Sequence, residues 1–121
     1  MHRLVKAIFA GAVLLIAGCA TSPEGLLDQG DRFEFSTART PYTAAICIAR
    51  NANSMGGGIA GEERTLGQSS TEVVVRPSRG ASETLAIVQI HYVGPLSKAT
   101  VSVNRSRSDR AAFAKRLMDG C

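Results

Sequence analysis

Residues 85–93 read Leu-Ala-Ile-Val-Gln-Ile-His-Tyr-Val, a long and almost wholly apolar run. Such a run, rich in β-branched residues, is typical of a central β-strand that is covered on both faces. Gly94 and Pro95 follow it and mark a turn. We therefore expect the domain to be organised around this strand.

Two further strands flank the central run in the sequence. Residues 71–76 read Thr-Glu-Val-Val-Val-Arg and end at Pro77. Residues 98–104 alternate between apolar and polar side chains, which is the pattern of a half-buried strand. Because the links between the three segments are short, we predict an antiparallel meander.

A fourth strand and a helix precede the meander. Residues 32–38 alternate, with two phenylalanines on the same side, which predicts another half-buried strand. Thr40 can cap a helix, and Pro41 fits its first turn, where a missing N–H has no cost. This helix is predicted to run to about Asn53.

The first predicted helix has an apolar stripe at three- and four-residue spacing, formed by Tyr42, Ala45, Ile46, Ala49 and Ala52. Cys47 lies off this stripe. Either the helix is covered on two sides, or the stripe is rotated.

A second helix follows the meander. Ser106 or Ser108 is expected to cap it, and the negative charge of Asp109 suits the positive end of the helix dipole at its N-terminus. Gly120 is a natural stop. The apolar face of this helix consists of Phe113, Ala114, Leu117 and Met118.

The order strand, helix, three strands, helix predicts the α+β class. We expect a four-stranded, mainly antiparallel sheet with both helices on one face. Residues 54–70 are predicted to be a surface loop. Its glycine-rich part, residues 54–61, lacks the preceding strand and the following Lys-Ser or Lys-Thr pair of a phosphate-binding loop. A loop of this length remains a candidate partner site.

The N-terminal residues have the form of an export signal. Residues 1–6 contain Arg3 and Lys6 and no acid, and residues 7–17 are uncharged and apolar. This apolar run is too short to span a bilayer, which takes about 20 residues. Ile-Ala-Gly-Cys follows at residues 16–19 and resembles the lipobox of bacterial lipoproteins.

This resemblance implies that residues 1–18 are removed as a lipoprotein signal peptide and that Cys19 carries a diacylglyceryl group. In many Gram-negative species the new amino group is acylated too, commonly with palmitate. Ala20, in place of aspartate, favours the outer membrane and a protein that faces the periplasm. Residues 19–31 are then the lipidated N-terminus and tether, and residues 32–121 form a single small α+β domain.

The tether is rich in small and polar residues, including Pro23 and Gly25, which favours a flexible linker. The alternative is that Leu26 and Leu27 dock on the domain.

The charge of the processed chain is modest. Loss of Arg3 and Lys6 leaves 12 basic against 10 acidic residues, or about +2. Aromatic residues make up only 5% of the sequence, which is few for stacking on bases or sugars. Nucleic acid is therefore not expected as a partner.

The three cysteines are predicted to have two roles, one as the lipid acceptor and two as the partners of a disulfide. With Cys19 lipidated, Cys47 and Cys121 remain, and an oxidising compartment favours their disulfide. The bond would join the two predicted helices. The alternatives are two free buried thiols, or a bridge from Cys121 to another chain.

The residues offer little catalytic chemistry. His91 is the one histidine left after processing, and no partner for a metal site or a catalytic triad is apparent. We therefore expect no metal and no cofactor. Arg105, Arg107 and Arg110 are candidate anion ligands, because spaced arginines on loops bind phosphate or carboxylate. Ordinary surface charge beside Asp109 is the alternative.

Two functional hypotheses follow. The first is a non-enzymatic, membrane-anchored envelope lipoprotein that binds a protein partner or an envelope polymer, as an assembly factor, subunit or inhibitor. The second is a small periplasmic hydrolase or ligand-binding enzyme that uses His91.

Overall fold

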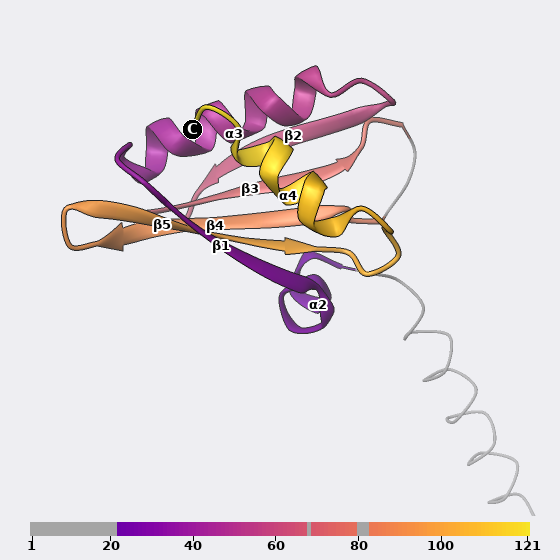
Figure 1. Ribbon diagram of the computed structural model, residues 1–121, viewed down its shortest axis with the longest axis horizontal. Helices are drawn as coiled ribbons and strands as arrows, with labels where there is room; N and C mark the ends of the chain where they lie inside the picture. The colour runs from indigo at the N-terminus through magenta and orange to yellow at the C-terminus, as the bar shows by residue number, and fades with distance from the viewer. Residues whose placement is uncertain (1–21, 68, 80–82) are drawn as a thin grey trace, which may run out of the picture.

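The structure is a computed structural model that describes residues 22–67, 69–79 and 83–121. The described residues form three helices, α2 (Pro23–Gln29), α3 (Pro41–Ser54) and α4 (Arg110–Met118). They also form five strands: β1 (Asp31–Thr37), β2 (Ile59–Thr65), β3 (Ser70–Pro77), β4 (Ala86–Val93) and β5 (Leu96–Val103). The strands make one sheet in the order β1-β5-β4-β3-β2, and all neighbouring pairs are antiparallel (Figure 1).

The predicted α+β class and the β3-β4-β5 meander are found, but the predicted four-stranded sheet was wrong. The additional strand, β2, lies inside residues 54–70, which we expected to be a loop. Its sequence, Ile-Ala-Gly-Glu-Glu-Arg-Thr, has little β propensity. β2 forms because it is an edge strand held by backbone pairing to β3 and by the neighbouring helix α3.

Two residues show why α3 lies so close to β2. A Cβ on Gly61 would be 2.7 Å from the Cβ of Ala52, so only glycine fits at this contact. Asn53 accepts a hydrogen bond from the Gly61 N–H and donates one to the Gly61 carbonyl. The Asn53 amide therefore blocks part of the free edge of β2.

The helices lie on both faces of the sheet, not on one (Figure 1). α3 and α4 cover one face, as predicted for those two helices, and pack on alternate residues such as Val73 and Val88. α2 covers part of the other face, where Leu26 packs against Val74 and Ile87. Ser22 caps α2 by accepting a hydrogen bond from the Gly25 N–H. Part of the predicted tether is therefore folded, because Leu26 is buried there.

The apolar stripe of α3 is rotated from the predicted one, which decides between the two readings of Cys47. Tyr42 is exposed, and Ile46 is only partly buried. The buried face of the helix consists of Pro41, Ala44, Ala45, Ile48, Ala49 and Ala52. Because Ile48 replaces Ile46 on this face, Cys47 lies at its border.

Candidate functional site

The predicted lipid acceptor, Cys19, lies outside the described residues. The described chain begins at Ser22, three positions later. Among the described helices, none is long and apolar enough to cross a membrane.

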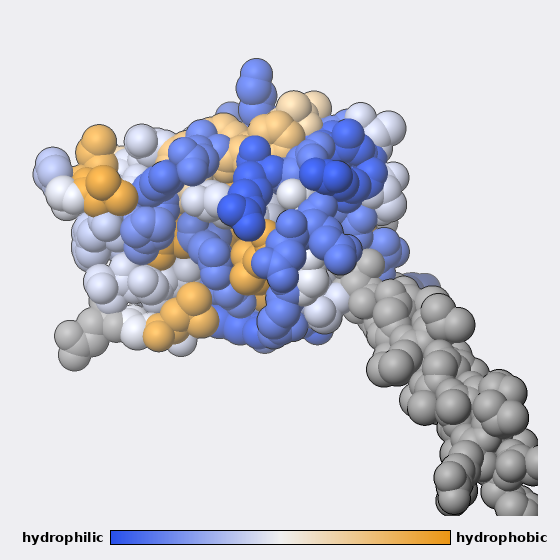
Figure 2. All heavy atoms as spheres, turned by 90° about the horizontal axis from the view of Figure 1, so that it is seen from below, coloured by the Kyte–Doolittle hydropathy of each residue, from blue (hydrophilic) through white to orange (hydrophobic). Residues whose placement is uncertain are grey.

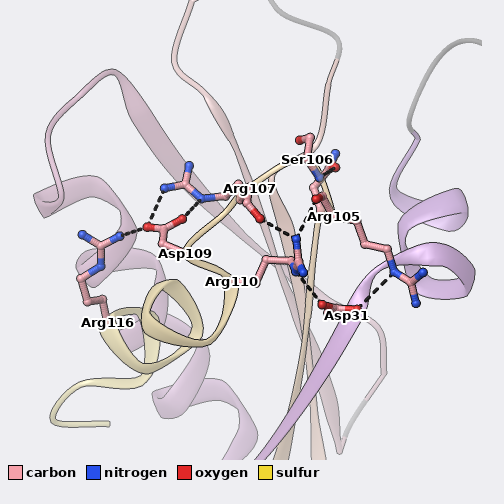
Figure 3. A network of polar contacts seen from close by, with 8 residues as sticks. Asp31, Arg105, Ser106, Arg107, Asp109, Arg110 and Arg116 are labelled. Carbon is pink, nitrogen blue, oxygen red and sulfur yellow. Dashed lines mark hydrogen bonds and ion pairs between the residues drawn. The ribbon is translucent and has the colours of Figure 1, made fainter.

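Asp31, the first residue of β1, lies between two of the predicted anion ligands (Figure 3). Its carboxylate oxygens are 3.1 Å from Arg105 Nε and 2.5 Å from Arg110 Nε. Arg110 also donates from Nη1 to the backbone carbonyls of Arg105 and Arg107. Arg110 therefore ties the start of α4 to the start of β1 and to the loop after β5.

Asp109 forms a second junction beside the first (Figure 3). Arg107 donates to both of its oxygens, at 3.0 and 3.2 Å, and Arg116 donates to one at 2.9 Å. The hydrogen bond from Arg107 holds the pKa of the Asp109 carboxyl below its usual value, and the positive charges of Arg107 and Arg116 act in the same direction. Arg107 also lies over the Phe113 ring, 4.0 Å from its centroid, in cation–π contact.

The structure thus brings the three predicted anion ligands together, and each already contacts a carboxylate. An anion would have to compete with Asp31 and Asp109. Arg105 has the most accessible side chain of the three, 70% exposed. The contacts account for these arginines as links between α4, β1 and the preceding loop, and anion binding stays a prediction.

The predicted disulfide is present. Cys47 and Cys121 are bonded, with Cα atoms 5.8 Å apart, and the bond joins α3 to the residues after α4. Hydrogen bonds hold the same segment: Asn51 Nδ2 donates to the carbonyls of Leu117 and Asp119, both at 2.8 Å. The hydroxyl of Thr37, at the end of β1, donates to the backbone oxygen of Cys121.

His91 lies exposed on β4. Its cross-strand neighbours are Ser70 on β3 and Lys98 on β5, and Lys98 pairs with Glu34 at 3.0 Å. In the part of the chain that the structure describes, no hydrogen bond or ion pair joins His91 to a carboxylate. No group of three His, Cys, Asp or Glu side chains in that part is arranged to hold a metal ion.

A cavity of about 400 Å³, which no sequence pattern predicted, lies at one end of the sheet. Both tyrosines of the chain lie on it: Tyr42 from the first turn of α3, and Tyr92 near the end of β4. The remaining lining residues are Thr40, Pro41, Thr65, Gly67 and Thr71. Thr71 also donates to the Pro41 carbonyl at 2.7 Å, which fixes the start of α3 on β3.

One signal in the sequence indicated that Tyr92 is exposed, although none indicated the cavity. The Gly94-Pro95 turn follows Tyr92 almost directly, and side chains beside a hairpin turn are seldom covered on both faces. The predictions of a wholly covered strand at Tyr92 and of a buried stripe that includes Tyr42 were wrong, because both side chains are exposed.

Comparison of the chain with protein-family models, with curated proteins and with solved structures finds no match in any of the three. The function therefore has to be argued from the residues of this chain.

Proposed function

We propose that this chain is a non-enzymatic lipoprotein of the bacterial cell envelope, anchored through lipid on Cys19, whose domain binds a protein partner or an envelope polymer. The observation that carries the proposal is Ile-Ala-Gly-Cys at residues 16–19, after a basic and then an apolar segment. Ala20 favours the outer membrane and the periplasmic side.

The pairing of the other two cysteines supports this proposal. Disulfides persist in oxidising compartments such as the periplasm. Because Cys47 and Cys121 are bonded to each other, Cys19 is the thiol that remains to accept lipid. Two or three acyl chains, at about 0.8 kcal/mol per buried methylene, make the attachment permanent.

The surroundings of His91 support a binding role over the hydrolase alternative. A catalytic histidine is commonly oriented by a carboxylate. The cross-strand neighbours of His91 are instead a serine and a lysine that is itself paired.

Substitution of Cys19 tests the anchor. Wild-type protein should enter the detergent phase on phase separation, and its mass should include the lipid. Cys19→Ser should remain uncut or become soluble. Cys121→Ser is the matched control, since it removes a different cysteine and should leave membrane attachment intact. A Cys19→Ser protein that is still processed and still fractionates with membranes would refute the proposal.

A further inference from the structure

The two edge strands of the sheet, β1 and β2, differ in how their free backbone edges are covered. On β2, the Asn53 amide bonds both the N–H and the carbonyl of Gly61, which blocks pairing at that residue. On β1, no hydrogen bond between described residues, apart from those of the β1–β5 ladder, reaches a backbone group of Arg32, Glu34 or Ser36. β1 crosses in front of the other strands in Figure 1. An uncovered strand edge is a template for a further strand.

The hydrogen bonds of the sheet show which backbone groups of β1 point outward. The Asn104 N–H donates to the Leu85 carbonyl, directly beyond the β4–β5 ladder. Because bonded and non-bonded pairs alternate along an antiparallel ladder, the even-numbered residues of β5 bond to β4 and the odd-numbered ones to β1. Their partners on β1 are odd-numbered too. The N–H and carbonyl groups of Arg32, Glu34 and Ser36 therefore lie along the free edge.

Two opposite charges on this edge select one way of pairing with a second copy. An antiparallel, two-fold pairing centred on Phe33 puts Arg32 of each copy directly opposite Glu34 of the other. These positions are then hydrogen-bonded pairs, each of which exchanges both N–H···O bonds. Opposite charges directly across a ladder stabilise it, whereas a pairing centred on Arg32 or on Glu34 would place like charges opposite each other. The sequence of β1 is therefore complementary to itself in one register.

The surroundings of the two charges fit this register. The Glu34 side chain is 63% exposed and pairs on its other side with Lys98 at 3.0 Å, so the paired sheet would hold it between two positive charges. Arg32 donates to the Leu27 carbonyl and keeps further N–H donors for a carboxylate. Both side chains alternate with Phe33 and so lie on the face of the sheet that carries α2. This side of the molecule is largely hydrophilic when it is seen from below (Figure 2).

The other face of β1 adds apolar contact to the pairing. Phe33 and Phe35 pack against the core under α3 and α4 but are only partly buried. In the register centred on Phe33, the two Phe33 side chains meet across the axis as a non-hydrogen-bonded pair, the kind in which side chains are closer together. Aromatic pairs across strands are stabilising. The pairing thus covers aromatic surface that a single copy leaves partly exposed.

The orientation of two paired copies is compatible with the lipid anchor of the proposed function, on which this step alone rests. The two-fold axis of an antiparallel strand pair in one continuous sheet is perpendicular to the sheet, so both α2 helices lie on the same face. In this register the two Asp31 residues, directly after α2, are about 14 Å apart along the strands. Both anchors therefore leave the dimer on one side and can enter one membrane.

We propose that two copies of this chain form a dimer through the free edge of β1, with Arg32 of each copy paired to Glu34 of the other. The two five-stranded sheets then become one continuous sheet. A strand of a different protein would have to supply matching charges of its own, whereas a second copy always supplies them. The interface is closed by its two-fold symmetry, so the pairing ends at the dimer.

Co-expression of two copies with different affinity tags tests the proposal on the full, lipidated protein. After solubilisation of the membranes in mild detergent, capture of one tag should recover the other for wild type. Arg32→Glu paired with itself, and Glu34→Arg paired with itself, should each lower the recovered fraction by about tenfold, because two like-charge pairs then face each other. Arg32→Glu co-expressed with Glu34→Arg should restore the recovery, because each charge again faces its opposite. Glu62→Arg, an exposed charge reversal on β2, is the control and should behave like wild type.

Four results would overturn the dimer: no recovery of the second wild-type copy, recovery unchanged by both charge reversals, a mixed pair that fails to restore it, or a loss in the Glu62→Arg control as large as in the β1 variants. Capture of a different protein that is lost in Arg32→Glu would assign the edge to a strand of that protein, and would overturn it as well. Restoration in the mixed pair also shows that both variants fold, since that pair contains no wild-type copy.

The Cys19→Ser fractionation tests the anchor separately. An anchored protein that recovers no second copy refutes the dimer alone. A dimer formed by a protein that proves to be unanchored refutes the anchor alone.

Discussion

Loss of the Cys47–Cys121 disulfide should remove a large share of the stability of the domain. The bond closes a loop between residues 74 positions apart. In the chain-entropy view, closing a loop of this length raises the free energy of unfolding by about 4 kcal/mol. Small domains have about 5–15 kcal/mol in total. We therefore expect Cys121→Ser to fold, but with a small free energy of unfolding.

The native contacts around the bond make this figure an upper value. Asn51 still donates to the carbonyls of Leu117 and Asp119 when the sulfur is replaced, and Phe113 and Leu117 remain buried under α3. α4 therefore stays docked in the variant. The loss of stability comes from the higher conformational entropy of the unfolded chain without the cross-link. For a domain of this size, about 4 kcal/mol corresponds to a drop in melting temperature on the order of 15–30 °C.

The assay is thermal unfolding followed by circular dichroism. Wild type is compared with Cys121→Ser and with the double variant Cys47→Ser/Cys121→Ser, which leaves no free thiol in the domain. Cys19→Ser is the control and should melt like wild type, because it leaves the Cys47–Cys121 bond intact. Reduced wild type should melt like the double variant.

Two results would refute this reasoning. If Cys47 and Cys121 both react with an alkylating reagent without prior reduction, the bond does not form. If the double variant melts within a few degrees of wild type, loop closure does not supply the stability, and the hydrogen bonds of Asn51 and the packing of α4 are sufficient.

Three further predictions concern single residues. Gly61→Ala should lower the free energy of unfolding by about 1–3 kcal/mol in urea, because the new Cβ would meet Ala52 at 2.7 Å. Gly67→Ala, where a Cβ meets nothing within 4 Å, should have little effect, and equal urea midpoints would contradict the close packing of α3 on β2. Asp109→Asn should be less stable than wild type at pH 7. The difference should fade as the pH falls below the usual carboxyl value of 3.8 toward the lowered pKa of Asp109, because the wild-type carboxylate is then protonated too; a difference that persists at low pH would show that charge is not the cause. His91→Gln should fold and complement a deletion strain fully, and a stable variant that failed to complement would argue for the hydrolase.

The elements that carry their own pattern were predictable from the sequence. The apolar run at 85–93 became β4, and alternation identified β1 and β5. The Thr40-Pro41 cap placed the start of α3 correctly. These signals are local, because each depends on side chains within a few positions of one another.

Two elements could not be predicted in this way, because tertiary contacts stabilise them. α2 has only seven residues, too few for a stable isolated helix, and it depends on the burial of Leu26 against Val74 and Ile87. β2 is a polar edge strand that depends on β3 and on the Asn53 amide.

The candidate sites divide in the same way. From motif and count the sequence by itself predicted an export signal, the lipid acceptor Cys19 and the pairing of Cys47 with Cys121, and of these the structure confirms the disulfide. Only the tertiary structure decided that Asp31 and Asp109 form ion pairs with the arginines around them. It also decided that Tyr42 and Tyr92 line one cavity. The physical reason is that these contacts join residues far apart in the sequence, whose meeting depends on strand order and on the rotation of α3 about its axis, and neither is encoded in a local pattern.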